Sequence, residues 1–315
     1  MDNFIFSLNV VTPLFVLMAI GYGVRQIRFI SDEFLAQMNR FVFKFCLPLM
    51  LFQDIRLSYK GDFSNTKLIF SSLAGITAVI LLSFLIVPFL VKRKGQRGSM
   101  IQGIFRSNFL IYGLPLATGM YGSAAVSGIA MLMGIMIPFY NVAAVIILSI
   151  YSETGTHRVT FKSVARDIVS NPLILGCFFG LLGGMMHLQF PVAIEIPLKQ
   201  LAGVAAPLAL FVMGGEFKFR SLRSNLVKVI AVTIARLIIV PVTVLGICVL
   251  IGFRDVDLAI LLSIFATPTA MASYIMAKNM GNDGDLSSQI VVLSTACSCV
   301  TIFLLIFFLR SWGYL

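Results

Sequence analysis

Two long apolar stretches, residues 100–122 and 257–281, are interrupted in the middle by polar residues. Each interruption combines polar side chains with residues that disturb a helix: Arg106, Ser107, Asn108, Tyr112, Gly113 and Pro115 in the first, and Thr267, Pro268 and Thr269 in the second. Proline removes a backbone donor and glycine loosens a helix, so backbone groups are freed at both places. Inside a membrane such groups need protein partners or a hydrated cavity.

The chemistry available at these interruptions is the binding of a small anion. A helix that restarts after a break directs its N-terminal amides into the cavity, where unsatisfied N–H groups and the helix dipole favour negative charge. The Asn108 amide, which donates and accepts, is expected to contact a carboxylate, with an interhelical hydrogen bond as the alternative. The same alternatives apply to Tyr112. The Thr267 and Thr269 hydroxyls either contact the ligand or cap the backbone freed by Pro268.

Three further polar residues lie inside other apolar stretches. Arg236 is near the middle of residues 226–251, where an arginine costs at least about 2.5 kcal/mol on insertion scales and so faces the protein interior. We expect it to form an ion pair with Asp54 or Glu216, or alternatively to bind the carboxylate of the ligand. Tyr140 and Asn141 either line the same cavity from the side or pack between helices.

The composition identifies the elements that must position these residues as membrane helices. Of the 315 residues, 59% are hydrophobic and 12% are charged, and the mean hydropathy is +0.98. A soluble domain of this size does not need so much apolar surface, so we expect an all-α polytopic membrane protein bound to the lipid bilayer. The net charge of +11 arises from short loops between apolar runs, which favours a topological role over nucleic-acid binding.

Ten apolar runs predict ten transmembrane helices. The longest polar connection divides them into residues 1–151, a cytoplasmic loop 152–169, and residues 170–315. Because each half holds five spans, the second half is expected to be inverted relative to the first, with broken fourth and ninth helices that cross. The set of loops richer in lysine and arginine is expected in the cytoplasm, which directs both termini to the outer side of the cytoplasmic (inner) membrane.

Several short motifs resemble the auxin efflux carrier family, which includes plant PIN-type carriers and bacterial permeases for small organic acids. The resemblance runs nearly end to end and rests on these segments: Asn39-Arg40-Phe41-Val42, Pro48-Leu49 with Phe52, Gly113-Leu114-Pro115-Leu116 with Met120-Tyr121-Gly122, Ser170-Asn171-Pro172, and Pro268 with Ala277-Lys278. It implies ten helices in two inverted repeats, with substrate bound beside the crossing, and a homodimer. Plant members have a proline where this chain has Ser107, so the first crossing is expected at Gly113–Pro115 instead.

The leading prediction is a secondary carrier, active or facilitative, for a small carboxylate such as malate, malonate or an auxin-like monocarboxylate. Proton coupling, sodium coupling and facilitated exchange all fit the sequence. A membrane-embedded ligand sensor is the first alternative. An intramembrane enzyme is the second and weaker one, because the sequence has no phosphate loop and no zinc-protease motif. We therefore expect no catalytic residue, no metal ligand and no cofactor.

Overall fold

The computed structural model describes residues 13, 16–58, 65–153, 169–217 and 219–315. Within these ranges the chain is helical apart from short connections and one isolated β-bridge. Residues 16–26 are helical, and the first half continues with α2 (Asp32–Phe41), the π-helical turn η1 (Val42–Cys46), α3 (Leu47–Ser58), α4 (Thr66–Leu90), α5 (Lys94–Phe105), η2 (Phe109–Gly113), α6 (Leu114–Tyr121) and α7 (Ser123–Tyr151). The second half contains α9 (Pro172–Met185), α10 (Val192–Glu216), α11 (Phe219–Ile234), η3 (Ala235–Ile239), α12 (Val240–Leu250), α13 (Asp255–Phe265), α14 (Ala272–Asn279) and α15 (Gly284–Ser311).

Five helical segments of the described chain are long and apolar enough to cross a membrane: Asp32–Leu57, Thr66–Leu90, Met131–Tyr151, Val192–Glu216 and Asn225–Leu250. A sixth is counted when the two parts of α15, which meet at 43°, are taken together. The ten predicted spans also include α5 with α6 and α13 with α14, which are broken into pieces of 8 to 12 residues. No such piece reaches the about 20 residues that one crossing needs. Residues 1–12, 14 and 15, which include part of the first predicted span, and most of loop 152–169 lie outside the described residues.

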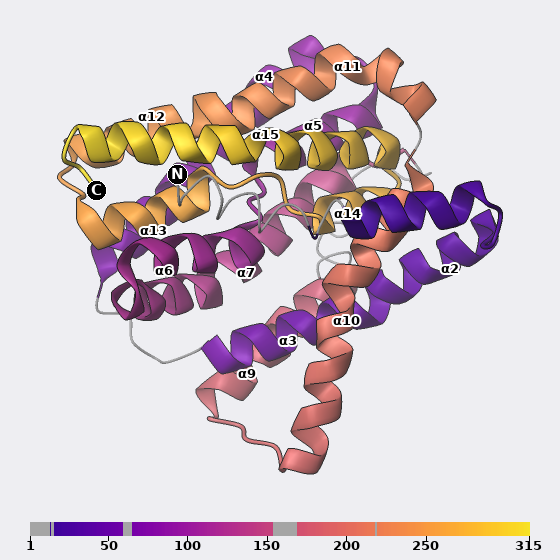
Figure 1. The fold of residues 1–315 in the computed structure, drawn as a ribbon, viewed down its shortest axis with the longest axis horizontal. Coiled ribbons are helices and arrows are strands. Elements are labelled where there is room, and N and C mark those ends of the chain that lie inside the picture. Colours follow the sequence, from indigo (N-terminus) through magenta and orange to yellow (C-terminus); the bar gives the residue numbers. More distant parts are fainter. Residues whose placement is uncertain (1–12, 14–15, 59–64, 154–168, 218) are drawn as a thin grey trace.

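The helices form two groups that contact each other along one side (Figure 1). The first helix group contains residues 16–26, α2, α3, α9 and α10, and the second contains α4 to α7 and α11 to α15. Two helix pairs in the first group approach very closely. A Cβ atom on Gly214 of α10 would lie 2.0 Å from the Met18 carbonyl oxygen, and one on Gly176 of α9 would lie 2.4 Å from the Pro48 oxygen. Only glycine allows these backbones to touch.

The connections between helices collect at two opposite ends of the molecule. At one end the connection before α5, the end of α7 and the turn before α15 meet, because Arg93 forms ion pairs with Glu153 and Asp283. The hydrogen bonds from Arg93, then the amide of Gly95 and the charge of Arg93, hold the pKa of Glu153 below its ordinary value of 4.5, against the opposing effect of burial. At the other end the Lys67 ammonium donates to the Ile251 carbonyl at 3.2 Å.

Candidate functional site

The two interrupted helices meet at their breaks. Ser107 and Thr269 form an antiparallel β-bridge. The Asn108 amide donates to the Pro268 carbonyl at 2.8 Å, and the Ala270 amide donates to the Arg106 carbonyl at 3.1 Å. We call residues 106–108 and 267–270 the crossing. The expectation that these stretches meet inside the protein is confirmed, since Ser107 and Thr269 are 6% and 0% exposed.

The hydroxyl groups at the crossing bind backbone carbonyls that the helix ends leave free. Thr269 donates to the Gly103 carbonyl at 2.7 Å, and Thr267 donates to the Ser263 carbonyl at 3.0 Å. The Ser107 and Thr267 hydroxyls lie 2.6 Å apart. Because the hydrogen of Thr267 is already used, Ser107 donates to Thr267. The threonines were expected either to contact the ligand or to cap free backbone groups. In the structure both hydroxyls cap backbone carbonyls.

Arg236 completes this set of bonds from the π-helical turn η3. Its guanidinium donates to the carbonyls of Thr267 at 2.8 Å, Ile264 at 3.0 Å, Ile104 at 3.3 Å and Phe105 at 3.4 Å. The expected ion pair with Asp54 or Glu216 is not found, and that prediction is wrong. Glu216 instead binds the Tyr274 hydroxyl and the Lys278 ammonium. The sequence could not distinguish a carboxylate partner from several carbonyls, because both satisfy a buried guanidinium.

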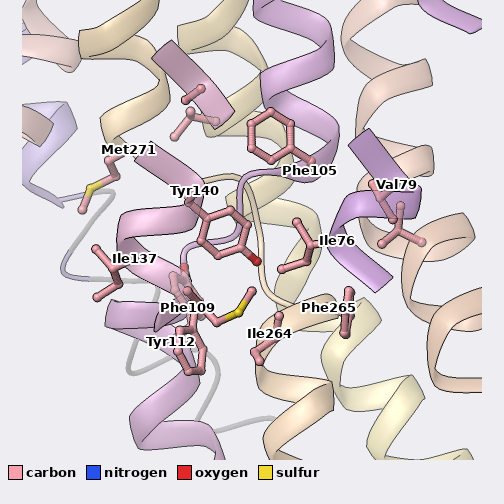
Figure 2. Close-up of a cluster of buried hydrophobic side chains, with 14 of the residues drawn as sticks. Ile76, Val79, Phe105, Phe109, Tyr112, Ile137, Tyr140, Ile264, Phe265 and Met271 are labelled. Carbon is pink, nitrogen blue, oxygen red and sulfur yellow. The ribbon is translucent and has the colours of Figure 1, made fainter. Parts of the chain in front are cut away.

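A cavity of about 80 Å³ lies beside the crossing, between the two helix groups. The second group contributes the crossing residues 106–108, Phe109, part of α7 and residues 270–272, and the first group contributes residues of α3 and α10. In Figure 2, Tyr140 lies between Phe105, Phe109 and Ile137, with Met271 nearby. The volume is below the about 300–1,000 Å³ of typical drug-sized ligand pockets, so the cavity suits a small molecule.

Arg106 is the charged residue of this cavity. It is 5% exposed, donates to Asn141 Oδ1 at 2.7 Å and contacts the sulfur of Met276. When the oxygen and nitrogen of the Gln102 side-chain amide are exchanged, the oxygen accepts a hydrogen bond from the Arg106 guanidinium at 3.1 Å. Gln102 is then a third neutral partner of Arg106. Among the described residues no carboxylate forms an ion pair with Arg106 or Arg236. A buried cation that has only neutral partners attracts an anion.

Residues that line the same cavity also have hydrogen-bond donors without partners among the described residues. Residues 270–272 precede and begin α14, and the amides of Met271 and Ala272 have no hydrogen bond to any described residue. Asn108, which is 5% exposed, lines the cavity, and its Nδ2 has no partner in the described part of the chain. Such unsatisfied donors at a helix start favour negative charge. The cavity can therefore bind a small anion.

The ten candidate residues divide into three sets. Asn108, Tyr140 and Asn141 line the cavity. Thr267, Pro268 and Thr269 belong to the crossing but not to the cavity lining, and Arg236 binds the Thr267 carbonyl. Tyr112 and Gly113 lie in η2, outside the cavity lining, and Pro115 lies in α6. Arg106 also lines the cavity, but it was not among the candidate binding residues. The sequence signal that could have identified it is a basic residue two positions before Asn108 in an apolar stretch.

The first break lies at residues 106–108, and the expectation that Gly113–Pro115 shapes the crossing is wrong. The helix continues through Gly113 as η2 and then through Pro115 as α6. Proline has no N–H group, and the wider π-helical turn tolerates the hydrogen bond that Pro115 cannot donate. Gly113 has a different use. A Cβ atom there would lie 2.4 Å from the Phe109 ring and 3.3 Å from Ser263 Cβ, so glycine lets η2 pack against α13.

Comparison with known proteins agrees with this architecture. The membrane transport protein family matches residues 6–306. A protein of Methanothermobacter thermautotrophicus, named only as a transporter, is 27% identical over 311 residues, which are 95% of this chain and 97% of the relative. A Rhizobium meliloti protein whose name proposes malonate transport is 25% identical over 309 residues, or 96% of each chain. Auxin efflux carrier component 8 of Arabidopsis thaliana is 34% identical over 123 residues, 36% of this chain and 33% of that one.

Apolar helices around a small cavity, which lies at two helix breaks and is lined by a buried arginine, define a membrane transporter of small molecules. The match over residues 6–306 then gives the family: the chain belongs to the auxin efflux carrier family of membrane transport proteins.

Proposed function

We propose that this protein is a secondary carrier, active or facilitative, that moves small organic anions across the cytoplasmic membrane by alternating access. The substrate class is a carboxylate, such as malate, malonate or an auxin-like monocarboxylate. The observation that carries this proposal is Arg106, a buried guanidinium in the cavity whose partners among the described residues are all neutral. A substrate carboxylate would supply the missing negative charge, with Asn108 as a second donor.

The arrangement of the helices supports two inverted repeats, residues 1–151 and 170–315. The close glycine contacts pair residues 16–26 with α10 and α9 with α3. Residues 16–26 and α9 lie in the first predicted span of their respective halves, and α3 and α10 lie in the second. Each contact therefore joins the first span of one half to the second span of the other half. The antiparallel pairing of Ser107 with Thr269 fits the same symmetry. We propose that the ten-span arrangement, with both termini outside, follows from this symmetry.

The position of the cavity supports alternating access. One wall belongs to the first helix group and the other to the second, so relative movement of the groups would open the cavity to one side at a time. Asn39 of α2, Glu216 of α10 and Tyr274 of α14 join the groups on one side of the cavity. The coupling of transport to a proton or to sodium, and a homodimer, remain part of the proposal without a residue assigned to them.

Counterflow of labelled malonate in proteoliposomes tests the function, with malate and an aromatic monocarboxylate as competitors. We expect counterflow in the wild type and a loss in Asn108→Ala that exceeds any loss of protein from the membrane. Equal losses of transport and of protein would instead make Asn108 a packing residue. A sensor would bind these acids without counterflow.

A further inference from the structure

We propose that Arg236 is a positioning residue, which holds both broken helices in the arrangement that forms the anion site without touching the anion. This proposal rests on the proposed function and assigns a role at the same site. Arg236 is 1% exposed and is absent from the cavity lining. Its guanidinium binds carbonyls on both sides of the crossing, two from the end of α5 and two from the end of α13 and the residues that follow it.

The need for such a residue follows from the ends of the two helices. The last four carbonyls of a helix have no partner within that helix, and two helices end at the crossing. At the end of α5, the Gln102 carbonyl accepts from the Arg106 amide, and the Gly103 carbonyl accepts from Thr269. The next two carbonyls, those of Ile104 and Phe105, accept from Arg236.

The end of α13 is similar, except that Arg236 binds Thr267, two residues beyond the helix, and not its last residue Phe265. The Leu262 carbonyl accepts from the Ala266 amide, and the Ser263 carbonyl accepts from Thr267. The Ile264 and Thr267 carbonyls accept from Arg236. One guanidinium therefore binds the free carbonyls of two helix ends that are far apart in the sequence. Inside a membrane no bulk water would replace these bonds.

Charge makes arginine suited to this position. Helix C-termini carry partial negative charge, and a cation beside them is favourable. The guanidinium has five N–H donors in a fixed planar fork, whereas a lysine ammonium is a compact point charge with three. The π-helical turn η3, which comes directly before the helix containing Pro241, carries Arg236 on its second residue. Only a forked donor reaches carbonyls of both helices at once.

The test uses hydrogen–deuterium exchange at the Asn108 and Ala270 amides, whose hydrogen bonds to Pro268 and Arg106 form the bridge of the crossing. In Arg236→Ala we expect exchange at these amides to be faster by roughly tenfold or more, because the carbonyl groups around them lose their donors. The control is Arg56→Ala. Arg56 is also buried, at 7% exposed, but it pairs with Glu195 away from the crossing.

Chemical rescue separates a positioning role from general damage. Millimolar guanidinium should slow exchange again in Arg236→Ala and restore malonate counterflow, but it should not restore counterflow in Asn108→Ala. If Arg236→Ala does not fold, Arg236→Lys is compared with Arg56→Lys, and faster exchange at the crossing is expected only in Arg236→Lys. Exchange at the crossing that is no faster than in the Arg56 variant would overturn the proposal, and so would an Arg236→Lys variant with wild-type protection. A wild type that fails to move malonate would count against the proposed function alone, because the exchange readout needs no substrate.

Discussion

Replacing Arg106 by glutamine should separate anion affinity from stability. The glutamine amide still has a donor for Asn141, which Arg106 binds at 2.7 Å, but it has no charge. A hydrogen bond to a charged group contributes about 1.5–3 kcal/mol, which corresponds to a loss of roughly 10- to 150-fold in affinity for an organic acid. If the substrate carboxylate is the missing partner of Arg106, Arg106→Gln should lose affinity within this range.

The stability of the substrate-free protein should respond differently. Taking a charge out of water costs several kcal/mol, and no described carboxylate offsets this cost for Arg106. Removing the charge should therefore leave the melting temperature unchanged or raise it. A structural arginine would behave in the opposite way, because its loss would lower the melting temperature.

The assay is isothermal titration of the purified protein with malonate and malate, together with a melting curve recorded without ligand. Arg97→Gln is the matched control, since it removes an equal charge from α5, the helix that Arg106 follows, at a residue that binds the Val91 carbonyl at 2.6 Å and is absent from the cavity lining. We expect Arg97→Gln to bind both acids as the wild type does. Wild-type affinity in Arg106→Gln, or a large fall in its ligand-free melting temperature, would refute the role given to Arg106.

Two further predictions concern stability. Gly214→Ala places a Cβ atom 2.0 Å from the Met18 carbonyl oxygen and should destabilise the first helix group by about 1–3 kcal/mol. The control is Gly134→Ala, which should be neutral because no atom lies within 4 Å of the added Cβ. Thermal unfolding followed by size-exclusion chromatography compares the two variants. Because the pKa of Glu153 is lowered in the folded state, its stabilising effect is present above pH 4.5 and is lost as the pH falls through the lowered value; Arg93→Gln should flatten that acid limb in melting curves recorded against pH.

The sequence predicted the elements of the site better than the bonds within them. Apolar length and broken periodicity were sufficient to find both interruptions, because a helix break needs proline, glycine or a polar residue. The pairing of Ser107 with Thr269 was expected only as a meeting of two segments. Which residue lines the cavity depends on the rotation of each helix about its axis, and a broken helix loses the regular period from which rotation is read.

Two of the sequence-based predictions were wrong, each for its own physical reason. Pro115 indicated a break that the π-helical turn η2 absorbs, so proline marked the disturbed helix and not the position of the crossing. Arg236 was assigned a carboxylate partner because buried charges are usually paired with opposite charges. Its actual partners are backbone carbonyls, which every residue possesses and which therefore leave no mark in the sequence.

The pairing of the two breaks is tested most directly by a disulfide between Ser107→Cys and Thr269→Cys, in a chain whose five native cysteines have been replaced. The hydrogen bonds that flank this pair make it a non-hydrogen-bonded antiparallel pair, for which Cα atoms lie about 4.5 Å apart, within the about 4.4–6.8 Å that a disulfide spans. The control pairs Ser107→Cys with Ser311→Cys, since Ser311 lies 17 residues along α15 from Ser294, or roughly 25 Å. We expect rapid cross-linking of the first pair in native membranes and none of the control. A first pair that stays reduced under the same oxidant, in protein that is still folded, would contradict it.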